Sequence, residues 1–95
     1  MIIRIGDRTI SGDRVIPRRL EPRDRLALLR AIAMLDLAEL RRHPFRGTCP
    51  TAYDGTESTF RFRGFPHPLA SCTYDLSRVK AVRLVERLRA TLRWR

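Results

Sequence analysis

The stretch STFRFRGFPHPLASCTY, residues 58–74, decides the fold of this 95-residue chain. Its first half alternates strictly, with Phe60 and Phe62 on one side and polar residues on the other. Such alternation indicates a strand with one buried face. Residues 64–68 hold the glycine and prolines typical of a turn, and residues 69–74 are expected to form the returning strand. We therefore expect an antiparallel hairpin with both phenylalanines in the core.

A helix is expected before this hairpin, over about residues 22–40. Pro22 suits its first position, and its apolar residues recur at helical spacing: Leu26, Leu28, Leu29, Ile32, Ala33 and Leu35. Asp36 and Glu39 have the spacing of a capping box. The sequence therefore leaves two versions open, one continuous helix or a break followed by a short second helix. The residue before Pro44 ends either version.

A second main helix is expected after the hairpin, over about residues 77–92. Its expected buried side consists of Val79, Val82, Val85 and Leu88. At the amino end of the chain, residues 2–5 and 14–16 are expected to be short strands around a turn at residues 11–13. Together these elements predict a single α+β domain over residues 1–95. It has a small antiparallel sheet built around the 58–74 hairpin, with the two main helices on one face.

The charge of the chain suggests a phosphate or an acidic protein surface as partner. Twenty basic residues against ten acidic ones give a net charge of +10. The expected basic surface consists of Arg61, Arg63, Lys80, Arg83 and Arg87. Because the hairpin phenylalanines should face the core, no base-stacking platform is predicted, and the nucleic-acid hypothesis is one of non-specific phosphate binding. The arginines could equally reflect composition alone.

Catalysis, cofactors and metals are not indicated. The chain has no glycine-rich phosphate loop and no serine in a nucleophile elbow. His43, Cys49, His67 and Cys72 have the chemistry of zinc ligands. Their spacing lacks the close pairs of known zinc motifs, so no metal site is predicted. We expect a binding protein rather than an enzyme.

The location of the protein stays open at the level of sequence. No apolar run approaches the roughly 20 residues of a membrane span, so no membrane partner is expected. The first residues are too charged for a signal peptide. This favours the cytoplasm, unless a leader has been removed from a secreted protein.

The two cysteines flank the first strand of the expected hairpin. In an ideal register Cys72 would face Thr59, so pairing with Cys49 requires residues 48–54 to fold back across the sheet. A disulfide is the expected use in an oxidising compartment, whereas in a reducing one both would stay thiols and pack as small hydrophobic residues.

The segment Cys49-Pro50-Thr51-Ala52-Tyr53-Asp54, followed by a strand, a turn and Cys72, resembles the reactive-site segment of Streptomyces subtilisin inhibitor proteins. That resemblance implies a disulfide between Cys49 and Cys72 that tethers a substrate-like loop. It also implies that Thr51 enters the primary specificity pocket of a serine protease, that Thr51-Ala52 is the bond presented, and that Pro50 and Tyr53 stiffen the loop.

The order of strands, helix, hairpin and helix is also similar to emfourin-type inhibitors of thermolysin-like metalloproteases. Both resemblances imply the same kind of partner, another protein of the endopeptidase class. The expected contact segment is Thr48, Cys49, Pro50, Thr51, Ala52, Tyr53 and Asp54. The alternative function is non-specific binding of nucleic acid.

Overall fold

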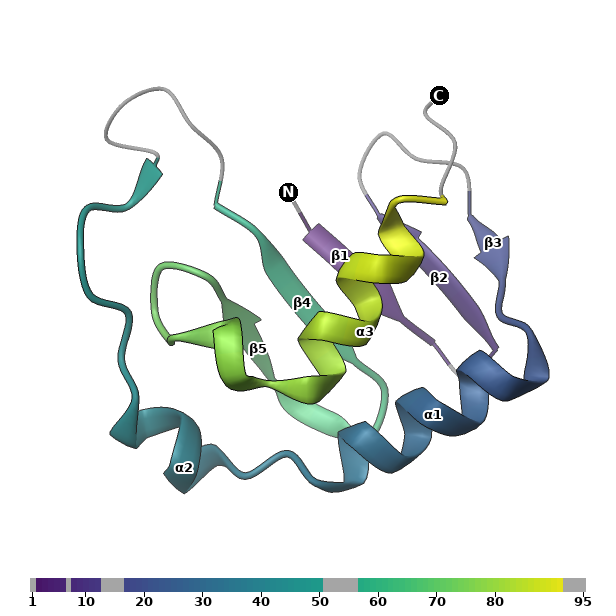
Figure 1. Ribbon diagram of the computed structural model, residues 1–95, viewed down its shortest axis with the longest axis horizontal. Helices are drawn as coiled ribbons and strands as arrows, with labels where there is room; N and C mark the ends of the chain where they lie inside the picture. The colour runs from purple at the N-terminus through teal and green to yellow at the C-terminus, as the bar shows by residue number, and fades with distance from the viewer. Residues whose placement is uncertain (1, 7, 13–16, 51–56, 92–95) are drawn as a thin grey trace.

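The computed structural model describes residues 2–6, 8–12, 17–50 and 57–91. In chain order its elements are β1 (Ile2–Ile5), β2 (Thr9–Gly12), β3 (Arg18–Arg19), α1 (Pro22–Ala33), α2 (Leu37–Arg42), β4 (Thr59–Phe62), β5 (Phe65–Ala70), the 3-10 helix η2 (Leu76–Arg78) and α3 (Lys80–Arg89). In Figure 1, α3 lies across the sheet and α1 runs along one end of it. The α+β class, with the main helices on one face, is confirmed.

The sheet is mixed rather than antiparallel as expected. Its strand order is β3-β2-β1-β4-β5, and β4 runs parallel to β1 while the other three ladders are antiparallel. The chain leaves β3, passes through α1 and α2 and returns beside β1. A long connection of this kind allows two neighbouring strands to run in the same direction. The expectation failed because alternation along β4 indicates a buried face but not a partner.

The core lies between the sheet and the helices. Ile3 pairs with Phe60 and Ile5 pairs with Phe62, so apolar side chains of adjacent strands lie side by side. Phe60 is 2% exposed and Phe62 is 4% exposed, as the hairpin alternation predicted. The buried hydrophobic residues are Ile3, Ile5, Ile10, Leu20, Leu28, Ala31, Leu40, Phe60, Phe62, Leu69, Leu76, Ala81, Val82 and Val85.

The first helical region is broken, which is one of the two versions that the sequence left open. Helix α1 ends at Ala33, and α2 begins after Asp36, whose Oδ1 accepts a hydrogen bond from the Ala38 amide at 2.9 Å. The face that α1 buries differs from the expected one. Leu28 is buried, whereas Leu26 is 50% and Leu29 is 42% exposed. Apolar residues occur on more than one side of α1, so the position of the sheet decides which of them become buried.

The last helix starts later than expected and is shorter. The Oδ1 of Asp75 accepts hydrogen bonds from the Ser77 hydroxyl at 2.6 Å and the Ser77 amide at 3.1 Å. These bonds hold the pKa of Asp75 below its usual value and start η2. Val79 is then extended, with φ −86° and ψ 110°, so α3 begins only at Lys80. Val82 and Val85 are buried as predicted.

The hairpin turns earlier than expected, at residues 63–64, where Gly64 has φ +91°. Residues 65–68, expected in the turn, belong to β5. Phe62 pairs with Phe65, and Phe60 pairs with Leu69. Residues 66–68 of β5, which include Pro66 and Pro68, therefore form a bulge opposite the single residue Arg61 of β4. Among the described strands β5 lies at the edge of the sheet, where prolines are tolerated because no neighbouring strand requires their missing amide protons.

The amino-terminal strands also differ from expectation. Ser11 and Gly12, expected in a turn, belong to β2. The turn lies instead between β1 and β2, where the Gly6 amide donates to the Thr9 carbonyl at 2.9 Å. The expected strand at residues 14–16 lies outside the described residues.

Candidate functional site

The segment after α2 folds back along the chain that follows β5. Pro44 forms an isolated antiparallel bridge with Tyr74. The Phe45 amide donates to the Thr73 carbonyl at 3.1 Å, and the Asp75 amide donates to the His43 carbonyl at 2.8 Å. These bonds bring the approach to Cys49 beside the residues that follow Cys72. The fold-back expected for pairing of the cysteines was that of residues 48–54, of which residues 51–54 lie outside the described part of the chain.

Cys49 and Cys72 form a disulfide across this fold-back. Their Cα atoms are 5.5 Å apart, and 23 positions separate them in the sequence. Gly47, with φ +115°, lies just before the first cysteine, in a backbone conformation that favours glycine. The bond therefore joins two segments that backbone hydrogen bonds already place side by side.

The register of the hairpin places Cys72 two positions away from its expected neighbour. Thr59 pairs with Ala70, not with Cys72, because the turn lies at residues 63–64 and β5 bulges between Phe65 and Leu69. Beyond that pair, the Ser71 amide donates to the Ser58 carbonyl at 2.8 Å, and the Ser58 amide donates to the Ser71 hydroxyl at 3.0 Å. These two bonds extend the pairing of β4 and β5 as far as the disulfide.

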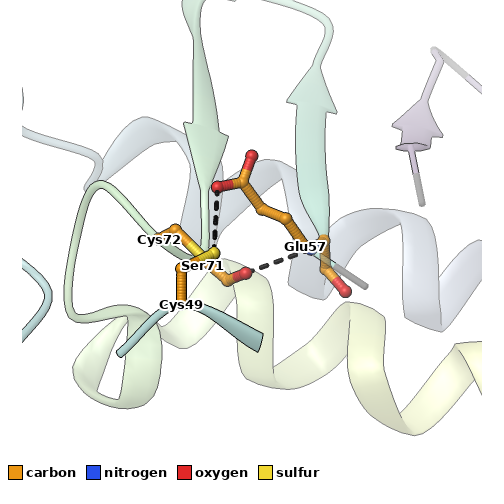
Figure 2. Close-up of a disulfide and its surroundings, with 5 residues drawn as sticks. Cys49, Glu57, Ser71 and Cys72 are labelled. Carbon is orange, nitrogen blue, oxygen red and sulfur yellow. Dashed lines mark hydrogen bonds between the residues drawn. A yellow bond between two sulfur atoms is a disulfide. The ribbon is translucent and has the colours of Figure 1, made fainter. Parts of the chain in front are cut away.

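Glu57 reaches the disulfide from the start of this hairpin. Figure 2 shows its carboxylate pointing toward the sulfurs, with Oε2 3.9 Å from the Cys49 Sγ. A disulfide sulfur carries no proton, so this approach is a contact rather than a hydrogen bond. Sequence reasoning missed Glu57 and Ser71, because their proximity to the cysteines depends on the register of the hairpin.

The expected contact segment is described only in its first part. Thr48 and Pro50 are exposed, and Cys49 is half-buried. Thr51, Ala52, Tyr53 and Asp54 lie outside the described residues. Pro50, the last described residue before this gap, follows Cys49 in the sequence. Glu57, the first described residue after it, contacts the disulfide.

Neither histidine joins the cysteines. His43 Nε2 lies 3.0 Å from the Glu39 carboxylate, and the His67 ring packs edge-on against Phe65. Among the described residues, the group with metal-ligand chemistry is Cys49, Glu57 and Cys72, whose ligand atoms lie within 4.8 Å of one another. The two sulfurs are bonded to each other, so they offer no thiolate to a metal.

The residues of the expected basic surface do not lie together. Arg61 is exposed between Phe60 and Phe62 on β4, so it faces away from the helices. Arg63 lines a hollow of about 200 Å³ between α1 and the end of the sheet. The remaining members lie exposed on α3: Lys80, Arg83 and Arg87. The alternation with Phe60 and Phe62 already placed Arg61 on the opposite face from the core, so it should not have been grouped with the charges of α3.

Two further findings bear on the function of the chain. None of the described helices combines the length and apolar character needed to cross a bilayer. Searches against protein-family models, curated proteins and solved structures found no match for this chain. The function must therefore be inferred from the residues and their geometry.

Proposed function

We propose that this protein is a proteinaceous peptidase inhibitor that presents residues 48–54 to an endopeptidase. The observation that carries the proposal is that the chain on both sides of this segment contacts the Cys49–Cys72 disulfide. Cys49, at its start, is bonded to Cys72, and Glu57, shortly after its end, contacts the same disulfide. A segment anchored at both ends has less conformational freedom to lose when a partner binds it, which strengthens binding.

The disulfide and a pair of hydrogen bonds hold the chain before and after this segment. The disulfide fixes the segment before Thr51 to the end of the hairpin. The reciprocal bonds of Ser58 and Ser71 fix the chain after it to the same place. A bound peptidase would therefore meet a segment whose base is part of the folded sheet. Partners whose contact surface is held in place before binding change little in shape when they bind.

The roles of the individual residues follow from the resemblance to subtilisin inhibitors. Thr51 would fill the primary pocket of the peptidase, and Thr51-Ala52 would be the bond presented for cleavage. Pro50 and Tyr53 would stiffen the segment. A residue in the primary pocket makes the central contacts of an interface, so its replacement should cost more than that of its neighbours.

The experiment is an inhibition assay with purified protein and a panel of subtilisin-type and thermolysin-type endopeptidases. We expect stoichiometric inhibition of at least one of them. Thr51→Pro should abolish it, because proline fixes φ and removes an amide that a substrate-like strand donates. The melting temperature should barely change. Arg87→Ala, on the exposed side of α3, is the matched control and should inhibit like wild type.

Two results would count against the proposal. One is a panel in which no serine or metallo-endopeptidase responds to stoichiometric wild-type protein. The other is a Thr51→Pro variant that unfolds, since this would make the segment part of the architecture rather than a presented surface. In the second case, Thr51→Gly separates the roles, because it removes the side chain while keeping the amide.

A further inference from the structure

Cys49, Cys72 and Glu57 bring together three groups that can bind a metal once the two sulfurs are thiols. Their Sγ atoms and a carboxylate oxygen lie within 4.8 Å of one another. The Glu57 carboxylate points toward the sulfurs from the start of the hairpin (Figure 2). Because the disulfide leaves no thiolate, a metal site made of these residues belongs to the reduced protein.

The backbone holds these three residues together by bonds that involve no sulfur. Residues 43–45 and 73–75 are joined by two backbone hydrogen bonds of 3.1 and 2.8 Å, between the approach to the first cysteine and the chain after the second. The Ser71 amide donates a third, of 2.8 Å, to the Ser58 carbonyl, between the neighbours of the second cysteine and of the glutamate. These bonds remain available after reduction, so the three ligands should stay close to one another.

The distances in this cluster suit a single tetrahedral ion. Zinc binds sulfur at about 2.3 Å, so two sulfurs on one zinc ion lie about 3.8 Å apart. The Cα atoms of the cysteines are 5.5 Å apart, and rotation of the two side chains can reach that separation. A sulfur and a carboxylate oxygen on one zinc ion lie about 3.6 Å apart. The Glu57 Oε2 is already 3.9 Å from the Cys49 Sγ.

We propose that the reduced protein binds one Zn²⁺ ion through the thiolates of Cys49 and Cys72 and the carboxylate of Glu57, with water in the fourth position. Thiolates favour zinc over Mg²⁺ and Ca²⁺, and a carboxylate is a regular zinc ligand. All three residues are half-buried, so an ion can reach them from solvent. A further interaction of Glu57 with its surroundings is compatible with this role, because ligating carboxylates are commonly hydrogen-bonded as well.

The exchange of a disulfide for a metal needs a reductant, which is a dithiol or a phosphine. The reductant gives up two electrons, the sulfur–sulfur bond breaks, and the sulfurs take up two protons. Zn²⁺ then binds the two thiolates and the two protons leave to solvent, while the ion keeps its oxidation state. The ion restores the link between the two segments in a reducing compartment, where disulfides are rare. The inference does not depend on peptidase inhibition.

The test is a titration of the reduced protein with Co²⁺, followed by displacement with Zn²⁺. A phosphine reductant in oxygen-free buffer keeps the cysteines as thiols and adds no competing thiolate. Tetrahedral thiolate coordination of Co²⁺ gives sulfur-to-metal charge-transfer absorption and strong visible bands. We expect one Co²⁺ per chain, displaced by one Zn²⁺, and no such spectrum from the oxidised protein.

Two matched variants test the carboxylate ligand. Glu57→Gln should weaken Zn²⁺ binding at least about tenfold, because loss of a ligand should cost no less than loss of a group that supports one. Glu39→Gln removes the same charge from a glutamate that contacts His43 instead of the cysteines, and it should bind Zn²⁺ like wild type. Equal Zn²⁺ affinities of wild type and Glu57→Gln would overturn the proposed ligand set.

The melting temperature gives a second measurement that does not depend on spectra. Zn²⁺ should raise the melting temperature of the reduced protein and leave that of the oxidised protein unchanged, because a ligand stabilises only the state that binds it. If the reduced chain unfolds without metal, Zn²⁺ must restore the circular dichroism of the oxidised protein. A reduced chain that stays unfolded in Zn²⁺ would overturn the inference, as would a tetrahedral Co²⁺ spectrum that persists in Cys72→Ala.

Discussion

Removal of the disulfide gives the sharpest test of how the candidate site is held. The perturbation is the double variant Cys49→Ala with Cys72→Ala, which removes the bond and leaves no thiol. The bond closes a loop whose ends are 23 positions apart in the sequence. The chain-entropy relation for a loop of this length gives a loss of roughly 3.4 kcal/mol in the free energy of unfolding.

This loss is large for a chain of 95 residues. Domains of this size are stable by about 5–14 kcal/mol in total. A loss of roughly 3.4 kcal/mol corresponds to a fall in melting temperature of roughly 14–27 °C. The hydrogen bonds that the Phe45 and Asp75 amides donate remain available in the variant. The fold-back should therefore persist at low temperature.

The assay is urea denaturation followed by far-ultraviolet circular dichroism, without reductant. Wild-type protein with excess dithiothreitol should approach the double variant. Ser71→Ala is the matched control, because it removes only the hydrogen bond that its hydroxyl accepts from the Ser58 amide. Its cost should be about 1 kcal/mol. A double variant within about 1 kcal/mol of wild type would refute the reasoning, since the bond would then restrict the unfolded chain far less than a loop of this length requires.

Three further predictions concern the core, the carboxylate beside the disulfide and the cap of η2. Phe62→Ala should cost about 3–5 kcal/mol in unfolding free energy, because the ring is 4% exposed. The unfolding free energy of Arg61→Ala, one residue away on the exposed face, should stay within about 0.5 kcal/mol of wild type. Similar melting curves for Phe62→Ala and Arg61→Ala would contradict the assigned faces. Glu57→Gln should speed reduction of the disulfide by dithiothreitol severalfold, because the carboxylate 3.9 Å from Cys49 Sγ disfavours a leaving thiolate; an unchanged rate would show that this contact has no electrostatic effect. Asp75→Ala should lower the melting temperature at pH 7. The pKa of Asp75 is lowered by the hydrogen bonds from Ser77, so its stabilisation is present above pH 3.8 and is lost as the pH falls through the lower folded pKa. The gap between the wild-type and variant melting temperatures should therefore close in strong acid, and a gap that persists there would argue against this linkage.

The sequence by itself determined the local elements. Alternation around Phe60 and Phe62 predicted the buried face of β4, because side chains of a strand alternate whatever its partner is. Pro22, Asp36 and Pro44 marked where helices begin or end, because these residues restrict the backbone or satisfy its first amides directly. Each of these signals acts over a few residues, so it can be recognised without the rest of the chain.

The tertiary structure decided everything that depends on distant partners. The parallel pairing of β1 with β4 and the buried side of α1 follow from how all the elements pack together, and no single segment encodes either. The turn at residues 63–64 and the bulge in β5 together shifted the hairpin register by two positions and brought Glu57 to the disulfide. A shift of two keeps every side chain on its own face, so the alternation that predicted the strand could not detect it.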